Sequence, residues 1–109
     1  MRVISRRKLR NFWREYPEAE QPLDDWYQAK VASWRSFANV RATFSSADQV
    51  GRLTVFNIGG NKFRLVAFID IKHGRLYIRH VLTHRDYDKE EWKKDRFASP
   101  PRERPKGDS

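Results

Sequence analysis

Two arginines stand in the middle of apolar segments in the second half of this chain. Arg64 lies in the run FRLVAFID and Arg79 in the run LYIRHVL, and a guanidinium group there is costly unless it faces water or an anion. Each guanidinium offers a fork of donors that matches two phosphate oxygens. On neighbouring strands of one sheet face, the two residues would form a phosphate pocket. The alternative is that they form ion pairs with Asp48, Asp70 or Asp86.

Groups that can transfer protons follow in the run THRDYD. Histidine exchanges a proton near neutral pH, so His84 is a candidate acid or base, and Tyr87 can donate a hydrogen bond. A single histidine is more often structural, and the signal here is its combination with two arginines. RNA cleavage suits this set because the ribose 2′-hydroxyl supplies the nucleophile. The protein then has to align that hydroxyl, move two protons and stabilise charge on the phosphate.

The sequence offers little for a metal or an organic cofactor. It contains no cysteine, and its three histidines are spread over positions 73, 80 and 84. The pairs Asp24-Asp25 and Glu90-Glu91 are adjacent in sequence and would point to different sides of a helix, so they form no carboxylate cluster. The run IGGN between two strand-like segments is a hairpin signal and is too short for a phosphate-binding loop. We therefore expect no metal and no cofactor.

Positive charge dominates the chain. Its 109 residues carry 23 Lys and Arg against 14 Asp and Glu, a net charge of +9, which attracts polyanions and makes nucleic acid the first candidate partner. Residues 1–14 hold six basic and no acidic residues. Arg6, Arg7 and Arg10 among them are candidate RNA contacts, the alternative being ordinary charge on an exposed helix. No apolar run approaches the roughly 20 residues of a membrane span, and no signal peptide is recognised, so we expect a soluble cytoplasmic protein.

Helical periodicity covers the first third of the chain. A short strand is predicted over 1–4, and a helix over 6–16 places four apolar or aromatic side chains on one face, namely Leu9, Phe12, Trp13 and Tyr16. Pro17 ends this helix, and a second one is predicted after Gln21. The segment 38–50 is expected to be an irregular connection that contains a short helical turn.

From position 52 the periodicity changes to that of strands. Strands over 52–58, 61–71 and 75–83, joined by turns at Gly59-Gly60 and His73-Gly74, predict a three-stranded antiparallel meander. Alternation places one set of side chains toward the helices, namely Phe63, Leu65, Ala67, Leu76, Ile78, His80 and Leu82. The other set falls on the second face, namely Lys62, Arg64, Val66, Phe68, Tyr77, Arg79 and Val81.

These elements predict one α+β domain over residues 1–98. An N-terminal strand and two helices would pack on one face of an antiparallel sheet that ends in the meander. A short charged helix is predicted over 85–95, and the segment 99–109, with its prolines and charges, is typical of a disordered tail.

The segment TVFNIGGNKFRL, followed by YIR, VLTH and Tyr87-Asp88, closely resembles the HigB-type toxins of bacterial type II toxin–antitoxin systems. The resemblance extends over nearly the whole chain to about Lys94. It implies a RelE-like fold and a metal-independent endoribonuclease that cuts mRNA while the message is translated on the ribosome. It also implies a helix-turn-helix antitoxin of the HigA type as partner, and contact with operator DNA through that antitoxin.

The resemblance also implies roles for individual residues. Arg64 and Arg79 would hold the scissile phosphate, with His84 or Tyr87 in proton transfer and Lys62 beside them. Asn57 and Asn61 flank the hairpin and would either contact RNA or fix the turn. Two other functions stay open at this point: a non-catalytic RNA- or ribosome-binding module, and a co-repressor that acts with its antitoxin on operator DNA.

Overall fold

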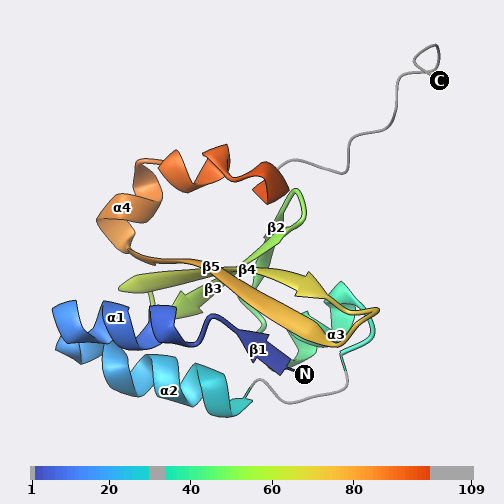
Figure 1. Ribbon diagram of the computed structural model, residues 1–109, viewed down its shortest axis with the longest axis horizontal. Coiled ribbons are helices and arrows are strands. Elements are labelled where there is room, and N and C mark those ends of the chain that lie inside the picture. The colour runs from blue at the N-terminus through green and yellow to red at the C-terminus, as the bar shows by residue number, and fades with distance from the viewer. Residues whose placement is uncertain (1, 30–33, 99–109) are drawn as a thin grey trace.

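Residues 2–29 and 34–98 are described by the computed structural model of the chain (Figure 1). The elements in chain order are β1 (Arg2–Ile4), α1 (Arg7–Glu15), the 3₁₀ turn η1 (Pro17–Ala19), α2 (Glu20–Ala29), α3 (Phe37–Thr43), β2 (Asp48–Val50), β3 (Leu53–Ile58), β4 (Phe63–Asp70), β5 (Arg75–Thr83), α4 (His84–Asp88), and the 3₁₀ turns η2 (Glu91–Lys94) and η3 (Arg96–Ala98). The predicted α+β class is confirmed. The tail predicted over 99–109 lies outside the described residues.

The sheet has five strands in the order β1-β5-β4-β3-β2. β3, β4 and β5 form the predicted antiparallel meander, and β1 joins the edge of β5 in parallel. The expected helical turn within 38–50 is present as α3, but the expectation of an otherwise irregular connection is wrong, because the segment ends in the edge strand β2, which pairs with β3. A strand of three residues with two exposed side chains is too short to show a strand period.

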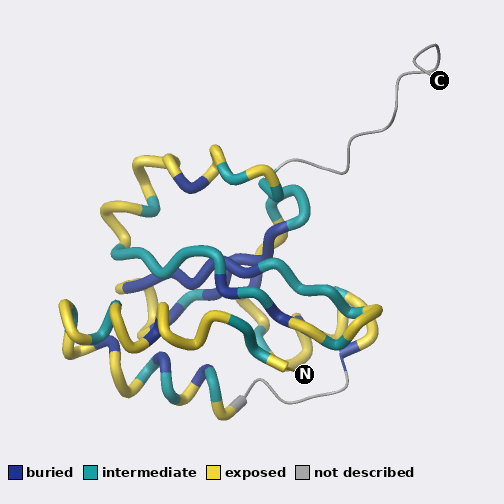
Figure 2. Tube along the Cα trace, in the orientation of Figure 1, coloured by how far each residue is buried: buried dark blue, intermediate teal, exposed yellow. Residues whose placement is uncertain are grey.

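The first face of the sheet is covered by α1 and α2, which lie side by side beneath it in Figure 1. Leu9 of α1 and Leu23 and Trp26 of α2 are buried in one cluster with strand residues such as Phe56 and Leu65. In Figure 2 the buried positions concentrate in the strands between the layers. Burial of this apolar surface against the helices supplies most of the driving force for folding.

The second face is covered by the C-terminal segment, which we define as residues 84–98 (α4, η2 and η3). Trp92 is buried there against Leu53, Val55 and Val66. The predicted single helix over 85–95 is interrupted, because Glu90 adopts a left-handed conformation with φ 60°. The break lets the chain turn back over the sheet (Figure 1).

A β-bulge changes the side-chain alternation of β5. Val66 pairs with His80 and Ala67 pairs with Ile78, so Arg79 has no partner of its own in the ladder. The predicted placement of His80 and Leu82 toward the helices is wrong, as is the placement of Val81 on the second face. Leu82 packs in the cluster under the C-terminal segment, and Val81 packs against the helix-side core.

Candidate functional site

Arg64 and Tyr87 form the centre of the candidate site, where β4 meets the C-terminal segment. The Arg64 side chain is buried, its Nη1 donates to the carbonyl of Phe63 at 3.2 Å, and its guanidinium carbon lies 5.2 Å from the centroid of the Tyr87 ring. The Tyr87 ring stacks in turn on Trp92 with 5.1 Å between centroids, and Trp92 Nε1 donates to the carbonyl of Tyr87 at 3.0 Å. The aromatic pair therefore fixes a cation on the second face of the sheet.

Three further predicted residues lie at the same end of the sheet. Asn57 of β3 is the cross-strand partner of Arg64, so the two side chains share a face. The backbone N–H of His84 donates to the carbonyl of Lys62 at 3.1 Å, which joins the start of α4 to the turn between β3 and β4. Asn61 is exposed in that turn. Lys62, Arg64, His84 and Tyr87 are thus gathered around one corner of the molecule.

The His84 ring is held by a carboxylate one helical turn away. Its Nδ1 lies 3.0 Å from Oδ2 of Asp88, and both side chains are about half exposed. The helix that carries them begins with a side-chain cap, in which Thr83 Oγ1 accepts from the backbone N–H of Asp86. With Nδ1 directed to a carboxylate, Nε2 is the ring nitrogen that can exchange a proton with a substrate.

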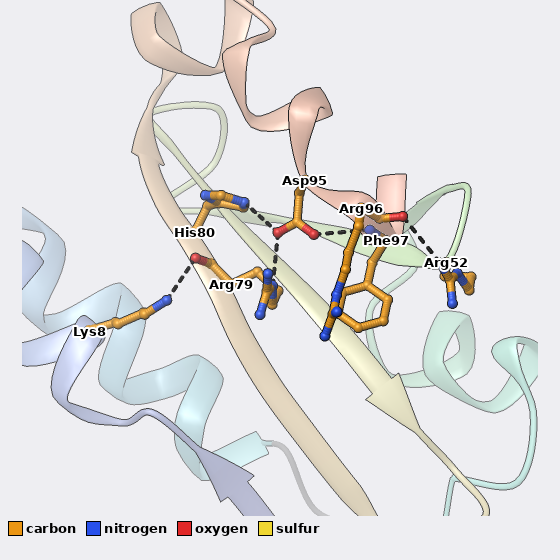
Figure 3. Close-up of polar contacts among 7 residues, drawn as sticks. All are labelled: Lys8, Arg52, Arg79, His80, Asp95, Arg96 and Phe97. Carbon is orange, nitrogen blue, oxygen red and sulfur yellow. Dashed lines mark hydrogen bonds and ion pairs between the residues drawn. The ribbon is translucent and has the colours of Figure 1, made fainter. Parts of the chain in front are cut away.

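Arg79 is engaged by Asp95, a residue of the C-terminal segment (Figure 3). Asp95 Oδ2 accepts from Arg79 Nε at 2.8 Å and lies 2.9 Å from His80 Nε2, while Oδ1 accepts from the backbone N–H of Phe97 at 3.0 Å. The Asp95 side chain is only 2% exposed. Burial by itself raises the pKa of this carboxyl, but the hydrogen bonds from Arg79, Phe97 and His80 outweigh burial and lower the pKa from 3.8 to about 2.

The two arginines face different partners on this side of the sheet. Arg64 pairs with Leu82, which is three residues along β5 from Arg79, or about 10 Å at the rise of a strand. The guanidinium of Arg64 lies over Tyr87, and that of Arg79 lies against Asp95. The carboxylate on Arg79 is therefore none of the three considered from the sequence.

Sequence reasoning missed His80 and Asp95 as members of the site. Strand alternation assigned His80 to the core face, and only the bulge directs it to the same carboxylate as Arg79. Asp95 follows a run of charged residues, and no periodic signal distinguishes it from its exposed neighbours. Its partners are 15 and 16 residues earlier in the chain.

The arginines of the first helix belong to the opposite layer of the molecule. Arg6, Arg7 and Arg10 are exposed at the start of α1, and the Arg6 guanidinium carbon lies 4.2 Å from the centroid of the Tyr27 ring. Lys8 connects the layers, since its Nζ donates to the carbonyl of Arg79 at 3.0 Å (Figure 3). The structure therefore does not gather these arginines with Arg64 and Tyr87.

Residues 2–29 and 34–98 contain no group of three His, Cys, Asp or Glu side chains placed to hold a metal ion. No helix in this part of the chain is long and apolar enough to cross a membrane.

The five-stranded sheet, the two helices on one face and the C-terminal segment on the other are consistent with a RelE-like α+β domain. The family of HigB toxins, described as the RelE-like toxic component of a toxin–antitoxin system, matches residues 19–90. The chain belongs to this family of toxins.

Curated relatives extend the match beyond the family model. The chain is 30% identical over 92 residues to the mRNA interferase toxin HigB of Escherichia coli K12, an alignment that covers 81% of this chain and 88% of the relative. The mRNA interferase HigB of Shigella flexneri matches equally well. That of Escherichia coli O6:H1 is 27% identical over 93 residues, which cover 82% of this chain and 90% of the relative.

Proposed function

We propose that this toxin is an endoribonuclease that cuts mRNA on the translating ribosome and so inhibits protein synthesis. The observation that carries the proposal is the gathering of Arg64, Tyr87, His84 and Lys62 at one corner of the sheet. Arg64 is the phosphate-binding cation, His84 and Tyr87 can transfer protons, and Lys62 adds a second cation. The relatives of this chain are named mRNA interferases.

The proposed reaction needs no bound nucleophile. The ribose 2′-oxygen forms a bond to the adjacent phosphorus, the bond from phosphorus to the 5′-oxygen of the next nucleotide breaks, and the products are a 2′,3′-cyclic phosphate and a 5′-hydroxyl. One base takes the proton from the 2′-hydroxyl and one acid delivers a proton to the departing 5′-oxygen. His84 and Tyr87 are assigned to these two transfers. Arg64 stabilises the charge that develops on the non-bridging oxygens.

The remaining residues bind and orient the RNA. Lys62 at the rim attracts the phosphate backbone, and Asn57 and Asn61 contact the strand beside the scissile bond. Arg79, oriented by Asp95, holds phosphate oxygens further along the same face of the sheet. The exposed arginines of α1, namely Arg6, Arg7 and Arg10, supply a second basic surface for ribosomal RNA.

The proposed partners follow from membership of the toxin family. The toxin acts in the cytoplasm and is held silent by a cognate helix-turn-helix antitoxin of the HigA type, through which the complex contacts operator DNA. The reaction uses neither a metal nor a cofactor, since the transferred protons and the phosphate charge are handled by side chains. Addition of a chelator should therefore leave cleavage unchanged.

Primer extension on a reporter mRNA tests this function. The wild type and Arg64→Lys are each expressed briefly, once with translation of the reporter permitted and once with its start codon removed. Arg64→Lys keeps the charge but loses the planar fork of donors, so we expect cleavage to fall by about 10²-fold or more. The matched control is Arg41→Lys at an exposed position of α3, which should cut like the wild type.

The outcomes separate the enzyme from a binding protein. Cuts that require both translation and Arg64 support the proposal. Growth arrest with intact reporter mRNA would replace it by a non-catalytic ribosome-binding module. Absence of growth arrest would favour a co-repressor that works only with its antitoxin.

A further inference from the structure

Phe97 is surrounded by three arginines from three different parts of the chain. The guanidinium carbons of Arg52, Arg79 and Arg96 lie 4.8, 5.1 and 4.8 Å from the centroid of its ring. We call these four residues the Phe97 cluster. It contains Arg79, but its other members take no part in the proposed cleavage step.

The Phe97 cluster is held rigidly against the sheet. Arg52 donates through Nη2 to the carbonyl of Arg96 at 3.2 Å (Figure 3). The Arg52 backbone N–H donates to the carbonyl of Phe97 at 2.7 Å. The Phe97 ring stacks on Phe68 with 4.4 Å between centroids and 12° between planes. Such fixed geometry lowers the entropic cost of binding a ligand.

Aromatic rings and cations line a cavity beside the cluster. The cavity measures about 310 Å³ and is bounded by Phe68, Tyr77 and Phe97 together with Arg79, Arg96 and Asp70. Its size lies at the lower end of the range for small-ligand pockets. Flat apolar walls beside guanidinium groups are the combination that accepts both a nucleobase and its phosphate.

Among the described residues, the carboxylates near Arg79 and Arg96 leave donors of both guanidinium groups open to a ligand. Asp95 meets Arg79 through Nε alone, and within the described residues neither terminal nitrogen of Arg79 has a hydrogen-bond partner. Asp70 at the cavity rim is engaged by His73 at 2.8 Å. Arg96 is exposed and its contact is with the Phe97 ring. The guanidinium groups of Arg79 and Arg96, both held against the Phe97 ring, repel each other, and an anion placed between them would relieve that repulsion.

We propose that the Phe97 cluster is a nucleotide subsite that binds a phosphate and the adjoining base of single-stranded RNA. Arg79 and Arg96 bind the phosphate oxygens, and the base lies against the aromatic wall. The inference rests on the proposed function for the identity of the strand. It extends that function, because a strand bound at Arg64 and at the Phe97 cluster would run along one face of the sheet, past positions of β5 that are three residues, or about 10 Å of strand, apart.

Binding of an uncleavable oligonucleotide tests the subsite apart from catalysis. The probe is a short fluorescein-labelled oligouridine in which every 2′-hydroxyl is methylated, and its Kd is measured by fluorescence anisotropy over a series of salt concentrations. The variants are Arg96→Ala and Phe97→Leu. The control is Arg41→Ala, which removes the same charge from an exposed position of α3 on the helix side of the sheet.

We expect Arg96→Ala to lower the slope of log K against log salt by about 0.7, the value for one lost phosphate contact on a single strand. Phe97→Leu removes the ring that positions the guanidinium groups of Arg79 and Arg96, so Kd should rise by about fivefold. Circular dichroism checks that both variants are folded. Equal effects of Arg96→Ala and Arg41→Ala, or no effect of either Phe97 cluster variant, would overturn the subsite.

Two comparisons distinguish this inference from the proposed function. If Arg96→Ala binds like the wild type while wild-type toxin still cuts mRNA, the subsite is wrong and the function stands. If Arg64→Lys cuts normally while Arg96→Ala binds poorly, the assignment of the cleavage site is wrong and the subsite stands. Labelled polyglutamate is the second probe, measured in the same way. If Arg96→Ala loses binding to polyglutamate but keeps binding to the oligonucleotide, the ligand is an acidic protein and the proposal is overturned.

Discussion

Asp95 accepts the Nε hydrogen of Arg79 at 2.8 Å and so ties the C-terminal segment to the bulged strand β5. The same carboxylate lies 2.9 Å from His80 Nε2 and accepts from the backbone of Phe97. One buried anion therefore orients an arginine of the sheet and also fixes the turn that carries the Phe97 ring. This contact gives the C-terminal segment a defined position over the second face.

Replacement of Asp95 by asparagine should destabilise the fold. The Asp95→Asn variant loses the charge that Arg79 and His80 meet, and we expect the free energy of unfolding to fall by about 2–4 kcal/mol. Urea unfolding followed by tryptophan fluorescence measures this change. The control is Glu90→Gln, which breaks an exposed ion pair with Lys93 and should cost less than about 1 kcal/mol. Equal effects of the two variants would contradict the buried role of Asp95.

Stability should depend on pH through the same carboxyl. The pKa of Asp95 is lowered from 3.8 to about 2 in the folded protein, so the folded state binds the proton less readily than the unfolded state. The resulting stabilisation, about 2 kcal/mol, is present above pH 4 and is lost as the pH falls toward 2. The difference in unfolding free energy between wild type and Asp95→Asn should shrink over that interval. A constant difference would refute this linkage.

Substitution of Tyr87 should reduce cleavage, whereas substitution of Trp92 should reduce stability. Tyr87→Phe keeps the ring over Arg64 and removes only the hydroxyl, so stability should change by less than about 1 kcal/mol while cleavage falls about 10²-fold or more. Trp92→Phe keeps an aromatic ring and removes the hydrogen bond to the Tyr87 carbonyl. It should cost about 1 kcal/mol or more of stability with little loss of cleavage. Unfolding curves and primer extension on the same preparations test both statements.

His84 should matter for cleavage and little for folding. His84→Ala is expected to lower the cleavage rate by about 10²–10⁴-fold. Asp88→Asn keeps the ring and weakens only its orientation, so the rate should fall less. Both residues are about half exposed, and the free energy of unfolding should change by less than about 1 kcal/mol. Unchanged cleavage in His84→Ala would remove this residue from the mechanism.

Some features of the fold could be predicted because they depend on short stretches of sequence. The apolar face of α1 and the alternation of β3 and β4 follow from the spacing of side chains along one element. The turn at Gly59-Gly60 was predicted from glycine alone, and both residues have positive φ in the structure. β2 escaped prediction because an edge strand of three residues carries no measurable period.

Local periodicity and one continuous motif are enough to predict the α+β class, the meander and the family of this toxin. The contacts of Arg79 and His80 with Asp95, and of the Arg64 guanidinium with the Tyr87 ring, become visible only in the folded chain. These contacts depend on a one-residue bulge in β5 and on the return of the C-terminal segment over the sheet. A bulge reverses the facing of every later residue in its strand, and it is selected by packing between distant segments, so no local pattern reveals it.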